Sequence, residues 1–387
     1  MATPTYALWG SELSPFSLKL SAMLDQVGAR YHWRPADGHR VENLRLAFRI
    51  ERMKRGGLPL TYPQTSELDE FPQVPYLLGD GGENLYDSSA LSTWLDDRHQ
   101  PDTPLLPAHD ATRFVARLID EYFDEFGLYM AHHNRWVVSA ATNDAGRRVA
   151  REYRFLFAGP LQRPAARWFA ARQVRRLPYL FSVASSGFEV PGLSGRLQPP
   201  SREGFPSTHA LLDRAFLRML ERMELILSDQ EYLLGPCFTL ADASAYGQLC
   251  MNTHDPSASQ IIELRAPLTY AWVQRIERRL VARTAASAEP CVSDRLHALL
   301  EEIGRVFVPL MKQNEAAYER ELASGGKARG FNEAAFDGHL ALYDGELDGS
   351  PFRSVVKTFQ VSVWRRLRAD WRRLGATERA ALPVSLD

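Results

Sequence analysis

The sequence predicts an α/β domain at residues 1–100, an all-helical domain at 101–285 and an additional helical extension at 286–387. Two observations predict this order. Short apolar runs alternate with amphipathic runs in the first hundred residues, whereas apolar residues recur at helical spacing through most of the remainder. The length of 387 residues also exceeds what one ordinary hydrophobic core holds, so several domains are expected.

The first domain is expected to contain a strand, a helix, a strand and a second helix, followed by a β-hairpin and a closing helix. Gly28 follows the first amphipathic run and is typical of a helix end. A glycine-rich turn at 79–82 separates two short apolar runs, which indicates the hairpin. The expected ranges are 6–9, 16–27, 31–33, 41–55, 74–78, 84–86 and 87–98.

Helices are expected to dominate the chain after a proline-rich linker at 101–110. Apolar residues from Phe114 to Met130 recur at helical spacing, which indicates one amphipathic helix. Thr239 and Asp242 have the spacing of a capping box, with Asp in place of Glu, and therefore indicate a helix start. The remaining expectations are a long loop at 182–208 and helices at 211–227, 243–250, 296–318 and 364–373.

Composition and charge narrow the class of protein. The formal net charge of -1 gives no bulk reason to expect nucleic acid or an anionic membrane as a partner. The cysteines Cys237, Cys250 and Cys291 are widely spaced without a Cys-x-x-Cys pair, so neither a metal site nor a disulfide framework is expected. No run is apolar and long enough to span a bilayer, and no signal peptide is evident, so we expect a cytoplasmic protein.

A turn between the first strand and the first helix carries the sequence Ser14-Pro15-Phe16-Ser17. Ser14 is a good N-cap residue, and Pro15 suits the first helical position. A hydroxyl and free backbone N–H groups would therefore converge at the positive end of the helix dipole. Such a place can hold a thiolate.

Four local motifs stand out, namely Leu8-Trp9-Gly10 with the turn at 14–17, Gln73-Val74-Pro75, Asp87-Ser88, and Tyr232-Leu233-Leu234-Gly235 with Thr239-Leu240-Ala241-Asp242. Together they resemble the cytosolic glutathione S-transferase superfamily, nearest its serine-type tau and omega classes. They cover residues 5–100 and about 105–280 in the order that the family shows. Gln73 stands where the family has Lys, and Asp87 stands where it has Glu.

The resemblance implies a thioredoxin-like N-terminal domain packed on an all-α domain, and a homodimer. It also implies glutathione as a co-substrate on the first domain and a small hydrophobic electrophile in the cleft between the domains. The implied thiol-activating residues are Ser14 and, as a second candidate, Ser17. The implied glutathione-binding residues are Phe16, Gln73, Val74, Pro75, Asp87 and Ser88, and the implied electrophile pocket is formed by Tyr122, Phe126, Tyr129 and His133.

The residue type at position 14 also predicts a reaction class. Glutathione attacks as a thiolate, and a free thiol has a pKa of about 8.5. A hydroxyl that donates to the sulfur at a helix N-terminus stabilises the anion and lowers that pKa. Because serine cannot form the mixed disulfide that a cysteine would form, conjugation, isomerisation or peroxide reduction is favoured over thiol transfer.

Each motif also has a purely structural interpretation. Ser14 and the Asp87-Ser88 pair are good helix caps. Ser17 faces solvent in this interpretation, and Pro75 is a trans proline that opens an edge strand rather than the cis proline that the resemblance implies. For Phe126, core packing is the favoured interpretation.

Two functions from different classes remain open. The first is a glutathione transferase acting on a hydrophobic electrophile. It is favoured by the presence of the Ser14, Val74-Pro75 and Asp87-Ser88 motifs. The second is a non-catalytic protein of the same fold used for binding or assembly, which the long extension and Gln73 favour. A glutathione-using reductase is disfavoured because neither position 14 nor position 17 is cysteine.

Overall fold

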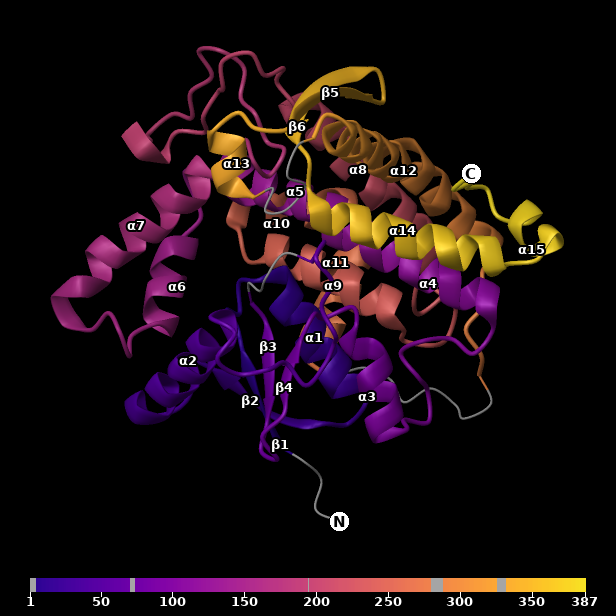
Figure 1. The fold of residues 1–387 in the computed structure, drawn as a ribbon, viewed down its shortest axis with the longest axis horizontal. Helices are drawn as coiled ribbons and strands as arrows, with labels where there is room; N and C mark the ends of the chain where they lie inside the picture. The colour runs from indigo at the N-terminus through magenta and orange to yellow at the C-terminus, as the bar shows by residue number, and fades with distance from the viewer. Residues whose placement is uncertain (1–4, 70–73, 194, 280–287, 326–331) are drawn as a thin grey trace.

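A computed structural model describes residues 5–69, 74–193, 195–279, 288–325 and 332–387. A small mixed sheet with its helices forms the lower part of the molecule in Figure 1, and a larger helical body lies above it. The predicted fold class, an α/β thioredoxin-like domain followed by a mainly helical remainder, is confirmed by the sheet topology given below.

The first domain holds one sheet of four strands in the order β2-β1-β3-β4. β1 pairs in parallel with β2 and antiparallel with β3, which pairs antiparallel with β4, so the hairpin follows a β-α-β unit. This is the thioredoxin-like pattern, and all of the predicted elements are present. Their bounds are β1 Thr5–Trp9, α1 Pro15–Gln26, β2 Arg30–Arg34, α2 Arg40–Lys54, β3 Tyr76–Gly79, β4 Asn84–Tyr86 and α3 Leu91–His99.

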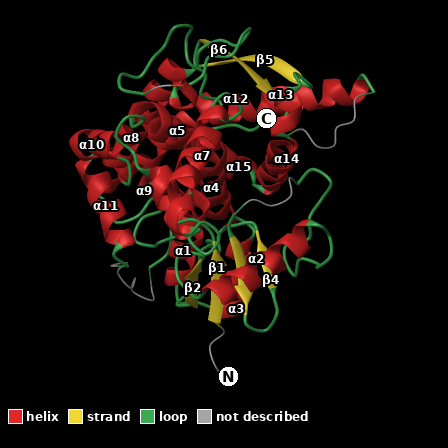
Figure 2. Cartoon of the chain, turned by 90° about the vertical axis from the view of Figure 1, so that its left-hand side faces the viewer, coloured by secondary structure: helices red, strands yellow, loops and turns green. Residues whose placement is uncertain are grey.

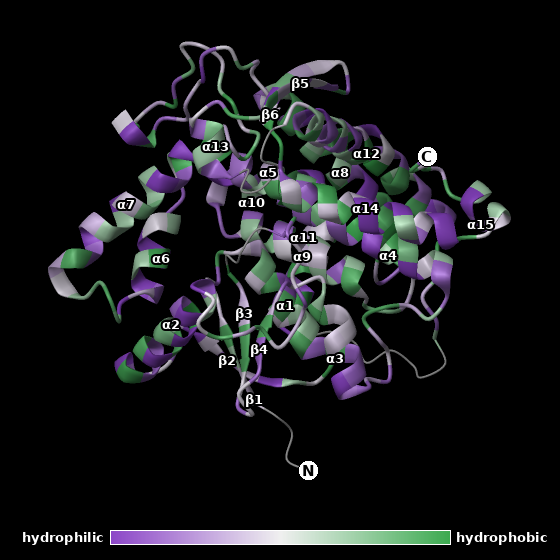
Figure 3. Cartoon of the chain, viewed as in Figure 1, coloured by the Kyte–Doolittle hydropathy of each residue, from purple (hydrophilic) through white to green (hydrophobic). Residues whose placement is uncertain are grey.

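The two faces of the sheet are covered by different helices (Figure 2). Successive strand residues point to opposite faces, so Leu77 packs in the main core shared with α1 and α3, whereas Tyr76 and Leu78 pack with α2. Figure 3 shows green, hydrophobic residues along β3, whereas β2 has the polar sequence RYHWR and is only partly buried. Burial on both faces explains why the segment that forms β3 is a nearly continuous apolar run.

The second domain begins with a long helical segment that changes its hydrogen-bond pattern twice. The π-helical turn η1 Phe123–Gly127 interrupts what the sequence predicts as one helix from Phe114 to Met130, and a second, η2 Asn134–Val138, follows beyond that prediction. The predicted capping box is confirmed, because Asp242 accepts a 2.9 Å bond from the Thr239 N–H. The helices are α4 Asp110–Tyr122, α5 Leu128–His133, α6 Ala145–Glu152, α7 Gln162–Arg175, α8 His209–Leu227, α9 Leu240–Thr253, α10 Pro256–Arg265 and α11 Pro267–Glu277, with 3-10 turns η3 Gly159–Leu161 and η4 Gly195–Leu197.

The C-terminal region contains a β-hairpin, which corrects the expectation of helices alone. Asp348 and Gly349 both have positive φ, of 50° and 69°, and form the two-residue turn between the strands. Asp-Gly between alternating apolar residues is a visible hairpin signal that the helical interpretation overlooked. The elements are α12 Asp294–Ala323, α13 Glu333–Asp337, β5 Leu342–Leu347, β6 Ser350–Val355, α14 Thr358–Arg373 and α15 Ala376–Ala380.

This extension packs on the second domain and shares its core. In Figure 1, α14 lies along α4 and beside α12. Trp371 of α14 contacts Phe114 of α4 with ring centroids 5.4 Å apart, and Trp364 is fully buried. The extension therefore covers the face of α4 that would otherwise be open.

The first domain is attached to the second through a close approach of α1 and α9. A Cβ atom on Gly247 of α9 would lie 2.3 Å from the carbonyl oxygen of Pro15, at the start of α1. Only glycine permits this approach, so Gly247 sets the position of the N-terminus of α1 against the helical domain.

Gly247→Ala is therefore expected to destabilise the protein by about 1–3 kcal/mol, the usual effect of overpacking. Urea unfolding followed by circular dichroism measures the change. The matched control is Gly304→Ala in α12, where the nearest atom is 3.6 Å away and the better helix propensity of Ala should be neutral or stabilising. Equal stability of Gly247→Ala and the wild type would contradict the close-approach argument.

Candidate active site

Ser14 lies at the start of α1, and its hydroxyl does not cap the helix. Ser14 occupies the N-cap position with extended backbone angles (φ -91°, ψ 124°), but its side chain makes no capping hydrogen bond and is partly exposed. The capping interpretation is therefore not what the structure shows for this residue. Within the described ranges, the N–H groups of Phe16 and Ser17 also have no hydrogen-bond partner, so the positive end of the helix is unoccupied by protein groups.

The helical domain holds the turn before Ser14 in place. The buried guanidinium of Arg135 donates a 2.9 Å bond to the Leu13 carbonyl, a second to the Met251 carbonyl, and pairs with Asp255 at 2.6 Å. The Glu12 N–H donates to a Glu152 carboxylate oxygen at 3.1 Å. Sequence reasoning missed these residues, and the only signal was a charged Arg135 inside an otherwise apolar helical segment.

Ser17 lies beneath the turn and is fully buried. A Cβ atom on Gly10 would lie 2.1 Å from its Oγ, so the glycine and the small serine pack directly against each other. The solvent-facing interpretation of Ser17 is therefore wrong. Its burial also leaves it no surface on which to contact a ligand, which makes Ser14 the better candidate.

The Val74-Pro75 motif lies beside the same turn. The peptide bond between them is cis, which the family resemblance implied. A Cβ on Gly10 would lie 3.6 Å from Pro75 Cβ, so the motif is adjacent to the strand end that leads into the turn. Val74 is partly exposed, and its N–H and C=O find no backbone partner in the part of the chain that is described. Gln73 lies outside the described residues.

Asp87 caps the turn at 87–90 that leads into α3, which is close to the structural interpretation of this motif. Its Oδ1 accepts bonds from the N–H groups of Ser89 and Ala90 at 3.0 and 3.2 Å, and its φ of 67° turns the chain into the helix. Burial raises the pKa of the Asp87 carboxyl, opposed by the Ala90 bond and by Arg366 of α14. The neighbouring Ser88 is also buried.

A buried ion cluster lies between this helix start and the second domain. Lys19 of α1 pairs with Asp120 at 2.5 Å and Asp124 at 2.6 Å, and donates to Ser89 Oγ at 2.7 Å. Burial opposes the lysine charge, but the two carboxylates outweigh it and raise the pKa of Lys19. Ser244 of α9 donates a 2.8 Å bond to Asp124, so the cluster joins α1, α3, α4 and α9.

The same edge contains an acid and a cation from distant parts of the chain. Burial, followed by the Asp120 charge, raises the pKa of Glu121 well above its usual value, while Arg366 lowers it. Arg366 of α14 is exposed, and its positive charge lowers the pKa of both Glu121 and Asp87. The extension thus contributes a positive charge that acts on residues of both domains.

The predicted electrophile-pocket residues are buried in the core, which corrects their expected role. Each of them is at most 2% exposed: Tyr122, Phe126, Tyr129 and His133. The extension covers this helical face. Tyr129 is bonded through its hydroxyl to Lys357 and, at 2.8 Å, to Gln360. The core-packing interpretation of Phe126 is confirmed.

The other pocket residues are also held by protein groups. Tyr122 packs edge-on against Phe307 of α12. His133 lies between Ser182 and Asp213, with both contacts at 3.0 Å. Helical spacing alone could not distinguish these core positions from pocket positions, because both lie on the same apolar face of the helix.

Two surface hollows of about 500 Å³ lie away from the turn. The first is lined by α2 and the following segment and includes Met53, Leu58 and Pro63. The second lies between α12 and α14 and includes Glu315 and Arg368. Neither is lined by a residue that the sequence predicts for the site.

No family model and no curated protein matches the chain. The chain is similar to solved structures, at low sequence identity. The beta-etherase LigF from Sphingobium sp. strain SYK-6 is 17% identical over 71% of this chain and 98% of its own, with a TM-score of 0.40. A glutathione S-transferase from Rhodospirillum rubrum is 17% identical over 76% and 99%, with a TM-score of 0.39. Similarity at this level carries no conclusion about activity.

A third structure, a rice glutathione S-transferase in complex with glutathione, is 16% identical over 72% of this chain and 88% of that chain, with a TM-score of 0.37. The fold assignment rests on this chain's own sheet topology.

Among the described helices, none has both the length and the apolar character that crossing a bilayer requires.

Glu152 gives the site a testable pH dependence. Burial raises the pKa of its carboxyl from 4.5 to about 7, so the folded state holds this proton more tightly than the unfolded state. Its favourable contribution is complete below pH 4.5 and is lost as pH rises through about 7. We expect Glu152→Gln, which keeps an acceptor for the Glu12 N–H, to be more stable than the wild type at pH 8 by at most about 3 kcal/mol.

Denaturant unfolding at pH 5 and pH 8 measures this difference, which should shrink at the lower pH. The control is Glu221→Gln on the surface of α8, where the side chain is 64% exposed and no such pH-dependent gain is expected. A Glu152→Gln variant that loses stability equally at both pH values would contradict the assignment.

Proposed function

We propose that this chain is a glutathione S-transferase-like enzyme that binds glutathione on its first domain and activates the thiol with Ser14. One observation carries the proposal: the Ser14 hydroxyl stands uncapped and partly exposed at the N-terminus of α1. Arg135 and Glu152 fix the turn that presents it. A free hydroxyl at a preorganised helix start is what stabilisation of a thiolate needs.

The proposed chemistry begins with ionisation of the thiol. The proton leaves to solvent, the Ser14 O–H donates to the sulfur, and the helix dipole favours the negative charge. The thiolate then uses a lone pair to form a bond to an electrophilic carbon, and the leaving group departs with the bonding electrons. Pre-organisation lowers the cost of the first step, because the donor does not have to break a capping bond.

Glutathione is an extended tripeptide, and the exposed backbone at Val74 offers it a partner. The N–H and C=O of Val74 can pair with the cysteinyl residue as a short β-augmentation. Phe16 is partly exposed, and Pro75 is buried. These residues would orient the sulfur toward Ser14.

The γ-glutamyl end is proposed to bind at the start of α3. Asp87 uses Oδ1 for both capping bonds, so among the described contacts Oδ2 remains available for the ligand's ammonium group. The N–H of Ser88, in the turn that leads into α3, and the positive charge of Arg366 would favour the carboxylate. Charge complementarity at both ends of the γ-glutamyl group supports this orientation.

The second substrate is proposed to be a small hydrophobic electrophile. It would approach over Phe16 and Val74 beside α14, because the inner face of α4 is covered by the extension. Detoxification by a cytoplasmic homodimer belongs to the same proposal and rests on the family resemblance.

One observation favours a second candidate function. The burial of Tyr122, Phe126, Tyr129 and His133 removes the apolar wall on which a transferase of this type would place its electrophile. A glutathione-binding protein without transferase activity, used for binding or assembly, agrees with that burial. The two candidates differ in whether the bound thiol is ionised.

Calorimetric binding of reduced glutathione, with the ultraviolet thiolate band recorded across pH, tests the proposal. The wild type should bind and lower the thiol pKa by about 1 unit or more from its free value of about 8.5. Ser14→Ala should still bind but lose most of that shift, and Ser14→Thr, which keeps the hydroxyl, should retain it. Ser21→Ala is the control, since its buried hydroxyl bonds to the Leu18 carbonyl within α1.

Binding without a pKa shift in the wild type would reject the catalytic function and leave the binding function. Absence of glutathione binding would overturn both. An unchanged pKa shift in Ser14→Ala would show that another group activates the thiol.

A further inference from the structure

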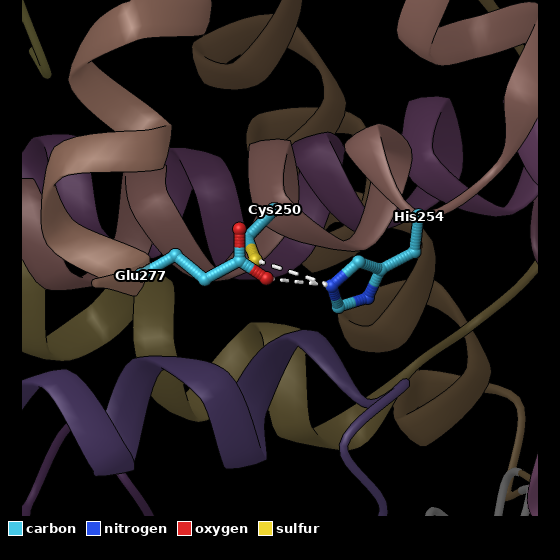
Figure 4. A group of neighbouring side chains, drawn as sticks. All are labelled: Cys250, His254 and Glu277. Carbon is cyan, nitrogen blue, oxygen red and sulfur yellow. Dashed lines mark hydrogen bonds and ion pairs between the residues drawn. The ribbon is translucent and has the colours of Figure 1, made fainter.

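Three side chains that can bind metal ions meet where α9 ends against α11 (Figure 4). Cys250 and His254 come from one side of α9 and its C-cap, and Glu277 is the last residue of α11. Their ligand atoms Sγ, Nε2 and a carboxylate oxygen all lie within 4.8 Å of one another. None of the three belongs to the proposed glutathione site.

The geometry around His254 is unusual for a plain hydrogen bond. Its Nε2 is 3.0 Å from Glu277 Oε1 and 3.9 Å from Cys250 Sγ, so both groups approach the same nitrogen (Figure 4). An imidazole nitrogen has one in-plane position, which carries either a proton or a lone pair. If Nε2 carries a proton, it can donate to the carboxylate, and if it carries a lone pair, it can accept from the thiol. Neither arrangement forms a good hydrogen bond to both groups.

We propose that this site binds one divalent metal ion of the zinc type, held by Cys250, His254 and Glu277. A cation at the shared position would bond to all three atoms at once. Zinc takes sulfur, nitrogen and oxygen ligands at about 2.0–2.3 Å, which places tetrahedral ligand atoms about 3.3–3.7 Å apart. The observed separations of 3.0 and 3.9 Å bracket this range, so small side-chain adjustments suffice.

Charge and hydrogen bonding also suit the ion. A thiolate and a carboxylate together neutralise the charge of a dication, which offsets the cost of taking it out of water. Gln274 donates to Glu277 Oε2 at 3.2 Å and thereby orients the carboxylate whose Oε1 faces His254. Outer hydrogen bonds of this kind are typical of metal sites, because they fix the direction of the ligand.

The site has an entrance. Cys250 is fully buried, whereas the side chains of His254 and Glu277 are 16% and 36% exposed. An ion can therefore enter beside Glu277, and water can complete a fourth position. The bound ion would link α9 to α11.

The expectation of no metal site rests on the absence of a Cys-x-x-Cys pair from the sequence. The Cys-x-x-x-His spacing of 250 and 254 was visible and places both side chains on one helical face. Glu277 follows 23 residues after His254, and nothing local shows that it comes close.

Titration of the metal-free full-length protein with cobalt, the spectroscopic substitute for zinc, tests the proposal. The wild type should take up one equivalent and show a thiolate-to-cobalt charge-transfer absorption and the visible bands of tetrahedral cobalt. Zinc should displace the cobalt and raise the melting temperature. Cys250→Ser should abolish the charge-transfer band, and Glu277→Gln should weaken zinc binding by about 10-fold or more.

Cys291→Ser is the matched control, because this cysteine is exposed and lies outside the cluster. It should leave cobalt binding unchanged. If Cys250→Ser fails to fold, Glu277→Gln still tests the proposal. The Glu277 side chain is 36% exposed at the entrance of the site, so its substitution is expected to leave the fold intact. A wild type without a charge-transfer band, or an equally tight Glu277→Gln variant, would overturn the proposal.

Discussion

The arrangement of the domains depends on one buried cation. Lys19 is 1% exposed and pairs with Asp120 and Asp124, two carboxylates on the first helix of the second domain. Removing one partner from such a buried ion cluster typically costs about 3–5 kcal/mol, because the remaining charges are left without compensation. The cluster therefore fixes α1 against α4. Ser14 lies at the start of the same helix, so the position of the candidate thiol donor depends on a buried contact little more than one helical turn away.

The extension changes what the second domain can offer a substrate. In the family that the motifs resemble, the helix that corresponds to residues 110–130 borders an apolar pocket. Here α12 and α14 bury that face of the helix. α14 also carries the exposed Arg366, whose charge lowers the pKa of Asp87 and Glu121. The predicted apolar pocket residues are buried, whereas a charged residue of the extension acts on the acids of this region.

Local features could be predicted from the sequence, and long-range contacts could not. Strand and helix positions followed from apolar periodicity, and the capping box at Thr239 was visible because its residues are three apart. The pairing of Lys19 with Asp120 had no local signal, since about a hundred residues separate them. The hairpin at 342–355 was missed although Asp348-Gly349 marks its turn. The apolar pattern around Tyr122 correctly predicts one apolar face of a helix. The sequence does not show what covers this face, because α12 and α14 lie more than 150 residues further along the chain.

Native-state hydrogen exchange of α1 and α9, measured by mass spectrometry in the wild type and in Lys19→Met, tests the central claim most directly. The slowest amides of both helices should share one opening free energy in the wild type, because the ion cluster makes them one cooperative unit. Lys19→Met should lower the opening free energy of α1 more than that of α9. Lys54→Met, which alters an exposed lysine, should change neither. Independent opening of α1 in the wild type, or no effect of Lys19→Met, would contradict the account.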